Sequence, residues 1–130
     1  AIRRHLAPRG RLWLDVFNPD LSMLAKDVRI GLDPCAFFVP RYDRTVFMTT
    51  EIRRTRRPQV QRVTFRYKWF GPDGREHGQR TEFDMTYFFP RELQMLLERN
   101  GLKIERLFGN YDGSEVTPAS PRLIARCRLA

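Results

Sequence analysis

The chain has 130 residues, 42% of them hydrophobic and 30% charged, which is typical of one globular domain. No run reaches the ~20 apolar residues that a membrane helix needs and no secretory leader opens the sequence, so we predict no membrane span and expect a cytoplasmic location. The net charge of +9 is carried mainly by arginine, but these arginines are scattered among acids, which makes nucleic acid a possible but disfavoured partner.

The first twenty residues predict a helical turn, a break and a strand. Ile2 and Leu6 lie on one face of a helical turn, and Pro8 to Gly10 provide the break after it. Leu12 to Phe17 is almost wholly apolar, which is typical of a strand covered on both faces in an α/β sheet. This strand ends at Asn18-Pro19, and ligands of open α/β sheets bind at the carboxyl ends of strands.

The next segment predicts a short helix followed by a loop. Leu21, Leu24 and Val28 fall on one helical face, and Asp20 is placed to cap its amino end. From Ile30 to Tyr42, glycine and proline residues surround an aromatic pair, which predicts a loop anchored to the core. In a complete enzyme such a loop could cover a pocket.

The middle third predicts a three-stranded antiparallel meander. Thr45 to Arg53, Val60 to Phe70 and Gln79 to Phe88 alternate apolar and polar residues with a period of two. Gly71 to Gly74 predicts the turn between the last two strands.

The apolar faces of these two strands also predict their register. Paired residue numbers must sum to an even value, because a slip of one residue would bury charged side chains. In such a register we expect Arg66 or Lys68 to face Glu82 or Asp84.

The last forty residues predict a helix and two strands. Pro90 suits the first helical position, and Asn100-Gly101 stops the helix. The predicted apolar stripe of the helix is Leu93, Leu96 and Leu97, and the predicted strands are Leu102 to Phe108 and Arg122 to Leu129.

Two parts of the sequence, HLAPRGRLWLDVFNP and YFFPRELQMLLERNGLKIERLFGNYDG with PRLIARCRLA, carry a family resemblance. The first resembles the helix end and fifth strand of class I S-adenosylmethionine-dependent methyltransferases. The second resembles the last helix and closing antiparallel strand pair of that family. Together they cover about half of the chain and are similar to the carboxyl-terminal half of these enzymes.

The resemblance implies an α/β fold, a partial Rossmann-like methyltransferase sheet with the three-stranded meander inserted. Residues 1–43 and 89–130 would form the methyltransferase-like part of a single partial domain, and residues 44–88 the β insertion. The family's glycine-rich cofactor loop, and the acidic residue that holds the cofactor ribose, are absent from these 130 residues. We therefore expect a truncated domain that is inactive alone, with S-adenosylmethionine bound only by a full-length enzyme.

The resemblance also implies where a small-molecule methyl acceptor binds. The loop after the fifth strand and the start of the last helix border the acceptor pocket in this family. No catalytic residue is assigned, because the sulfonium donor is already activated and the protein mainly aligns the reactants. The implied substrate-binding residues are Phe17, Asn18, Tyr42, Tyr87, Phe89 and Tyr111. A homodimer is expected, because the first strand lacks its usual neighbour and exposes an unpaired edge.

Other interpretations remain open at this stage. Asn18 has a structural alternative in making the turn before Pro19, and the aromatic residues have one in packing the core. The histidines and the two cysteines, Cys35 and Cys127, lack the spacing of a metal site, so no metal is predicted. The alternative function is a non-enzymatic, basic, β-rich module that binds a polyanion or a protein partner.

Overall fold

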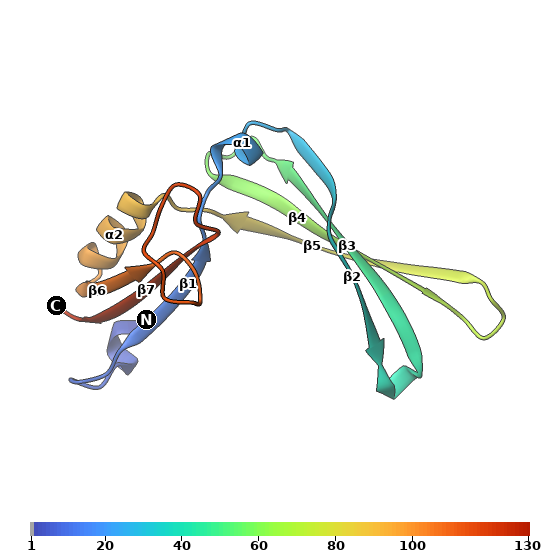
Figure 1. The fold of residues 1–130 in the computed structure, drawn as a ribbon, viewed down its shortest axis with the longest axis horizontal. Coiled ribbons are helices and arrows are strands. Elements are labelled where there is room, and N and C mark those ends of the chain that lie inside the picture. Colours follow the sequence, from blue (N-terminus) through green and yellow to red (C-terminus); the bar gives the residue numbers. More distant parts are fainter. Residues whose placement is uncertain (1) are drawn as a thin grey trace. The chain divides into compact units, whose positions relative to one another are not determined.

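The computed structural model describes residues 2–130 and divides the chain into two compact units (Figure 1). The first, called the α/β unit here, comprises Ala1–Met23 and Tyr87–Ala130. The second, called the β unit, comprises Leu24–Thr86. Each unit contains its own antiparallel sheet, with strand order β1-β7-β6 in the first and β2-β3-β4-β5 in the second. The expected mixed α/β fold class is confirmed, and the β unit is inserted between β1 and the last helix.

The α/β unit has a three-stranded sheet with one principal helix beside it. β7 lies in the centre and pairs with both neighbours, so β1 is an edge strand, as the sequence predicts. The helices and strands that lie wholly in this unit are η1 (Ile2–His5), β1 (Leu12–Phe17), α2 (Pro90–Arg99), β6 (Leu102–Phe108) and β7 (Arg122–Leu129).

The core of the α/β unit lies between α2 and the sheet. The backbone amide of Phe89 donates a 3.0 Å hydrogen bond to the Glu92 carboxylate, and Pro90 occupies the first turn, so the helix begins where predicted. Leu93 is only 1% exposed, whereas Leu96 is 43% exposed and does not belong to the buried stripe predicted for it. The buried cluster consists of Leu93, Leu97, Leu102, Leu123, Ala125 and Cys127.

β1 is covered on one face rather than on both. Leu12, Leu14 and Val16 pack against the buried cluster, whereas Trp13 and Phe17 on the other face are 57% and 56% exposed. The prediction of a doubly covered strand is therefore wrong for the described residues. The segment Leu12 to Phe17 is almost wholly apolar because its exposed face also carries apolar side chains, the aromatic rings of Trp13 and Phe17.

The β unit contains four strands where the sequence predicts three. β3 (Arg44–Arg54), β4 (Val60–Phe70) and β5 (Glu76–Thr86) confirm the meander. The fourth strand, β2 (Val28–Val39), pairs with β3 and occupies most of the segment predicted as a loop. A short 3-10 turn, η2 (Pro40–Tyr42), joins these two strands.

The irregularity of β2 explains why it was missed. Gly31 and Asp33 have φ angles of 71° and 47°, and the pairing with β3 shifts twice between Arg29 and Cys35. These bulges break the alternation on which strand prediction depends. Pro34 is tolerated because β2 is an edge strand. The predicted helix before it is also shorter, since α1 spans only Leu21–Leu24.

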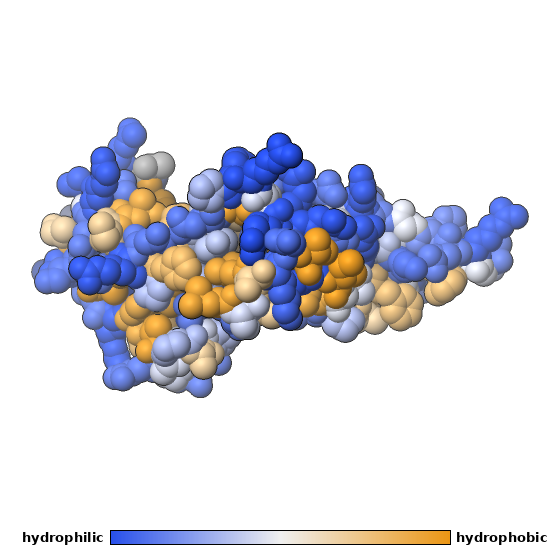
Figure 2. Space-filling model, turned by 90° about the horizontal axis from the view of Figure 1, so that it is seen from above, coloured by the Kyte–Doolittle hydropathy of each residue, from blue (hydrophilic) through white to orange (hydrophobic). Residues whose placement is uncertain are grey.

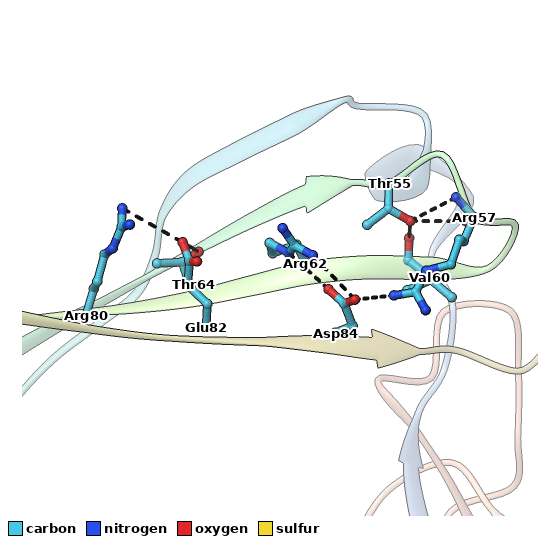
Figure 3. Close-up of polar contacts among 8 residues, drawn as sticks. All are labelled: Thr55, Arg57, Val60, Arg62, Thr64, Arg80, Glu82 and Asp84. Carbon is cyan, nitrogen blue, oxygen red and sulfur yellow. Dashed lines mark hydrogen bonds and ion pairs between the residues drawn. The ribbon is translucent and has the colours of Figure 1, made fainter.

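The predicted parity of the β4–β5 register is confirmed, but the predicted charge pairs are not. Arg62 faces Asp84 with a 3.0 Å ion pair, and Arg57 also contacts this carboxylate (Figure 3). Arg66 faces Arg80 instead of an acid, because the paired residue numbers sum to 146, whereas those of the expected charge pairs sum to between 148 and 152. A shift of the register by an even number keeps the apolar side chains of β4 and β5 on the same face, so the alternation of apolar and polar residues cannot distinguish these registers.

Arg66 is compensated on the other side, by Glu51 of β3. Glu51 is 4% exposed, accepts hydrogen bonds of 2.8 and 3.2 Å from Arg66, and also pairs with Arg53. These hydrogen bonds, first from Arg66 and then from Arg53, hold the pKa of Glu51 below its ordinary value. The charged face of the β sheet is thus held together by ion pairs.

Apolar side chains also reach the surface, where they appear orange among the blue charged residues in Figure 2. Among the described residues, no helix has the length and apolar character required to cross a membrane.

Candidate acceptor site

A hollow of about 650 Å³ lies at the carboxyl end of β1 and is called the β1 hollow here. Its walls come from three segments of the α/β unit, namely residues 18–22 after β1, residues 89–90 at the start of α2, and residues 116–119 before β7. This is the end of the strand at which open α/β sheets bind ligands.

Asn18 joins two of these walls. Its side-chain Nδ2 donates hydrogen bonds to the carbonyl oxygens of Ser120, at 2.8 Å, and Thr117, at 3.4 Å. Its backbone amide donates to the Pro121 carbonyl at 3.2 Å. These three hydrogen bonds tie the segment after β1 to the loop before β7. The carboxamide oxygen has no hydrogen-bond partner among the described residues, and it can accept a hydrogen bond from a ligand.

The aromatic wall of the β1 hollow is Phe89. The ring of Tyr87 meets it edge-on, with the centroids 6.0 Å apart and an interplanar angle of 88°. This T-shaped arrangement fixes the orientation of Phe89. Tyr87 is not among the residues that line the hollow.

Phe17 and Tyr111 belong to a different cluster, centred on Arg122. The Arg122 guanidinium carbon lies 5.0 Å from each of their ring centroids, and Arg122 pairs with Asp15 at 3.0 Å. The Tyr111 hydroxyl also donates a hydrogen bond to Asp15. That hydrogen bond, followed by the contact with Arg122, lowers the pKa of Asp15, and it raises the pKa of Tyr111. A smaller hollow of about 340 Å³ lies beside this cluster.

Tyr42 lies in the β unit, in a third hollow of about 430 Å³. Of the six predicted site residues, the structure thus brings Asn18 and Phe89 into one hollow, with Tyr87 supporting it. Phe17 and Tyr111 share the Arg122 cluster, and Tyr42 is in the other unit.

Sequence reasoning missed the loop of residues 116–119 that closes the β1 hollow. This loop is rich in small residues and proline and carries no chemical motif. The loop belongs to the site only because the folded chain brings it beside Asn18, which donates a hydrogen bond to the Thr117 carbonyl.

The described residues contain no group of three or more His, Cys, Asp or Glu side chains able to hold a metal ion. Cys127 is buried in the core, where desolvation raises the pKa of its thiol, so it is poorly suited to act as a nucleophile. The arrangement of the β1 hollow can bind and orient a ligand through shape, aromatic contact and hydrogen bonds to side chains such as Asn18.

No family profile and no curated protein matches this chain. Solved structures do match. The CcbJ methyltransferase of Streptomyces caelestis matches with a TM-score of 0.69 and 16% identity, over 98% of this chain and 50% of its own. The chain has the fold of half a methyltransferase.

Two further solved structures agree. An S-adenosylmethionine-dependent methyltransferase from Clostridium acetobutylicum ATCC 824 has a TM-score of 0.67 and 12% identity, over 98% of this chain and 47% of that one. The third is CalS10, an amino pentose methyltransferase from Micromonospora echinaspora solved with S-adenosylmethionine bound. It has a TM-score of 0.57 and 21% identity, over 95% of this chain and 46% of its own. The chain therefore spans about half the length of these enzymes, consistent with their carboxyl-terminal half.

Proposed function

We propose that this chain is the acceptor-binding portion of an S-adenosylmethionine-dependent methyltransferase that acts on a small molecule. The observation that carries the proposal is the likeness of fold, which extends over 98% of the chain in the first two methyltransferases. The β1 hollow supports it, because it lies where this class of sheet binds ligands.

The cofactor site is assigned to residues outside these 130. A sulfonium cofactor supplies an activated methyl group, and its adenosyl portion is usually held by a glycine-rich turn between a strand and a helix. Gly71, Gly74 and Gly78 do not form such a turn, because they lie in and beside the hairpin between β4 and β5. The residues described here do not fit that group, and we assign them to the acceptor.

The chemistry of the β1 hollow favours an acceptor that carries N–H or O–H groups. The oxygen of the Asn18 carboxamide offers a hydrogen-bond acceptor to it, since Nδ2 already donates to the carbonyl oxygens of Ser120 and Thr117. Phe89 offers an apolar surface beside it. A small amine or amino sugar fits this combination, and one similar enzyme is an amino pentose methyltransferase.

A polyanion-binding function is less well supported than the sequence suggests. Many arginines of the β unit are already paired with acids, including Arg62 with Asp84 and Arg66 with Glu51. Paired cations release fewer counterions on binding a polyanion and attract it less strongly. For the 130-residue chain alone we also propose homodimer formation through the free edge of β1, because an unpaired edge strand is a template for another strand.

The test uses the protein encoded by the complete reading frame around these codons. We expect it to bind S-adenosylmethionine in calorimetry and to release S-adenosylhomocysteine with members of a panel of amino sugars and simple amines. The 130-residue chain alone should bind the cofactor weakly or not at all. A complete protein that fails to bind S-adenosylmethionine overturns the proposal.

Substitutions at Asn18 test the acceptor site itself. Asn18→Ala removes both the acceptor oxygen and the bonds to Ser120 and Thr117, so kcat/KM for the acceptor should fall by about tenfold. Asn18→Asp keeps an acceptor oxygen and loses the donor, so it separates the two roles. Met95→Ala, at an exposed position of α2, is the matched control. Cofactor affinity should remain unchanged in all three variants.

A further inference from the structure

The β unit contains a hollow of about 430 Å³ that the proposed function does not use. Its lining is mainly aromatic, from Phe37, Tyr42, Tyr67 and Trp69, with Arg44 as its only charged residue and Gln79 as a further polar one. Its volume lies within the range of about 300–1,000 Å³ that is usual for small-molecule sites.

Arg44 lies against two aromatic rings of this hollow. Its guanidinium carbon lies 5.3 Å from the Tyr42 ring centroid and 5.6 Å from that of Trp69. The side chain is half-buried, and its hydrogen bond among the described residues is a 3.3 Å contact from Nε to the Tyr42 carbonyl. No carboxylate of residues 2–130 pairs with it.

On the opposite face of the sheet, arginines have acidic partners. There, Arg53, Arg62 and Arg66 all pair with acids. Arg44 lies on the other, aromatic face because side chains alternate along β3. A partly desolvated cation without a counter-ion is unfavourable, and the aromatic rings offset this only in part. A bound anion would supply the missing charge.

We propose that this hollow binds an aromatic carboxylate. The carboxylate would accept a pair of hydrogen bonds from the planar Arg44 guanidinium, which matches it geometrically. The ring would stack against the aromatic walls, with Trp69 and Tyr42 nearest to the cation. A phosphate group fits less well, because its higher charge calls for several donors and the walls supply one cation.

This site is independent of the acceptor assignment. The residues of the β1 hollow all belong to the α/β unit, and those of the Arg44 hollow all belong to the β unit. If the methyltransferase proposal fails, the proposal for the Arg44 hollow is unaffected. If the proposal for the Arg44 hollow fails, the methyltransferase proposal is unaffected.

Trp69 provides a direct signal for the test. The other tryptophan, Trp13, lies in the α/β unit, so the Trp13→Phe variant has its indole emission from Trp69 alone. Titration of this variant with benzoate should change the Trp69 emission in a saturable way. Benzamide, which has the same shape without the charge, should bind at least about tenfold more weakly.

Arg44→Gln in the same background should weaken benzoate binding by at least about tenfold and leave benzamide binding unchanged. The control is Arg75→Gln, which removes an exposed arginine at the β4–β5 turn. Equal binding of benzoate and benzamide, or unchanged benzoate affinity in Arg44→Gln, overturns the proposal.

A second measurement avoids any dependence on the folding of the variant. In the unsubstituted chain, benzoate should shift the backbone amide NMR signals of residues lining the hollow, such as Val39, Arg44 and Gln79. Shifts confined to other residues, or no saturable shift at all, would refute the assignment.

Discussion

The packing of α2 gives a prediction whose size can be worked out from neighbouring positions of one helix. Leu93 is 1% exposed and belongs to the buried cluster with Leu102 and Leu123. Leu96 lies three residues later and is 43% exposed. The same substitution, leucine to alanine, therefore removes the same atoms from a core position and from the surface.

For Leu93→Ala, the loss of transfer free energy and the cavity left behind together predict a destabilisation of about 2–5 kcal/mol. For Leu96→Ala, we expect a change within about 0.5 kcal/mol, because the methyl groups are already partly hydrated and alanine favours the helix. With a urea dependence of about 1–2 kcal/mol per molar for a small unit, the midpoint of Leu93→Ala should fall by about 1 M or more.

The measurement follows Trp13, which stacks on Phe108 in the α/β unit with 5.9 Å between ring centroids. In a Trp69→Phe background, indole fluorescence then reports the unfolding of this unit alone, so the second unit does not distort the transition. Similar midpoints for Leu93→Ala and Leu96→Ala would refute the placement of the core between α2 and the sheet.

Three further predictions follow from the geometry. Because hydrogen bonds from Arg66 and Arg53 lower the pKa of Glu51, its stabilising effect is present above the ordinary value of 4.5 and is lost as pH falls below it. In urea titrations, the free energy of unfolding of Glu51→Gln should therefore fall less steeply at acid pH than that of the unsubstituted chain. An unchanged pH dependence would contradict the pairing of Glu51 with Arg66 and Arg53. Gly101 has a φ of 72°, and an added Cβ would lie 3.0 Å from the Arg3 side chain. Gly101→Ala should therefore lower the free energy of unfolding by about 1–2 kcal/mol, and an equally stable variant would count against this backbone conformation. For the 130-residue chain alone, light scattering should reveal a dimer, as pairing through the free β1 edge predicts, and a monomeric mass at high concentration would argue against it.

Local signals in the sequence predicted most of the secondary structure. β1, β6 and β7 begin and end at the predicted residues, and α2 begins at the predicted Pro90 and ends before the predicted Gly101 stop. In these segments the apolar pattern and the Gly, Pro and Asn residues beside it indicate the same boundaries. β2 is the exception, because its strand conformation depends on pairing with β3 and not on its own pattern.

The candidate site could be predicted less well, for a physical reason. Asn18 and Phe89 were named from the family resemblance, and spacing in the sequence gave no sign that they share a hollow. The hydrogen bond from Asn18 to the Ser120 carbonyl joins residues about a hundred positions apart, and such contacts exist only in the folded chain. Arg44 was missed because its lack of a counter-ion is a property of three-dimensional surroundings.

The proposed function asks little of catalytic side chains. In methyl transfer the donor is activated by its own sulfonium charge, so the acceptor side must chiefly hold the nucleophilic atom in line. Under the proposed function, a shaped hollow with a fixed amide and an oriented aromatic ring, as at Asn18 and Phe89, would meet that requirement. Substitutions there should therefore alter acceptor kinetics and leave the pH dependence of the reaction unchanged, which is the pattern expected of positioning groups.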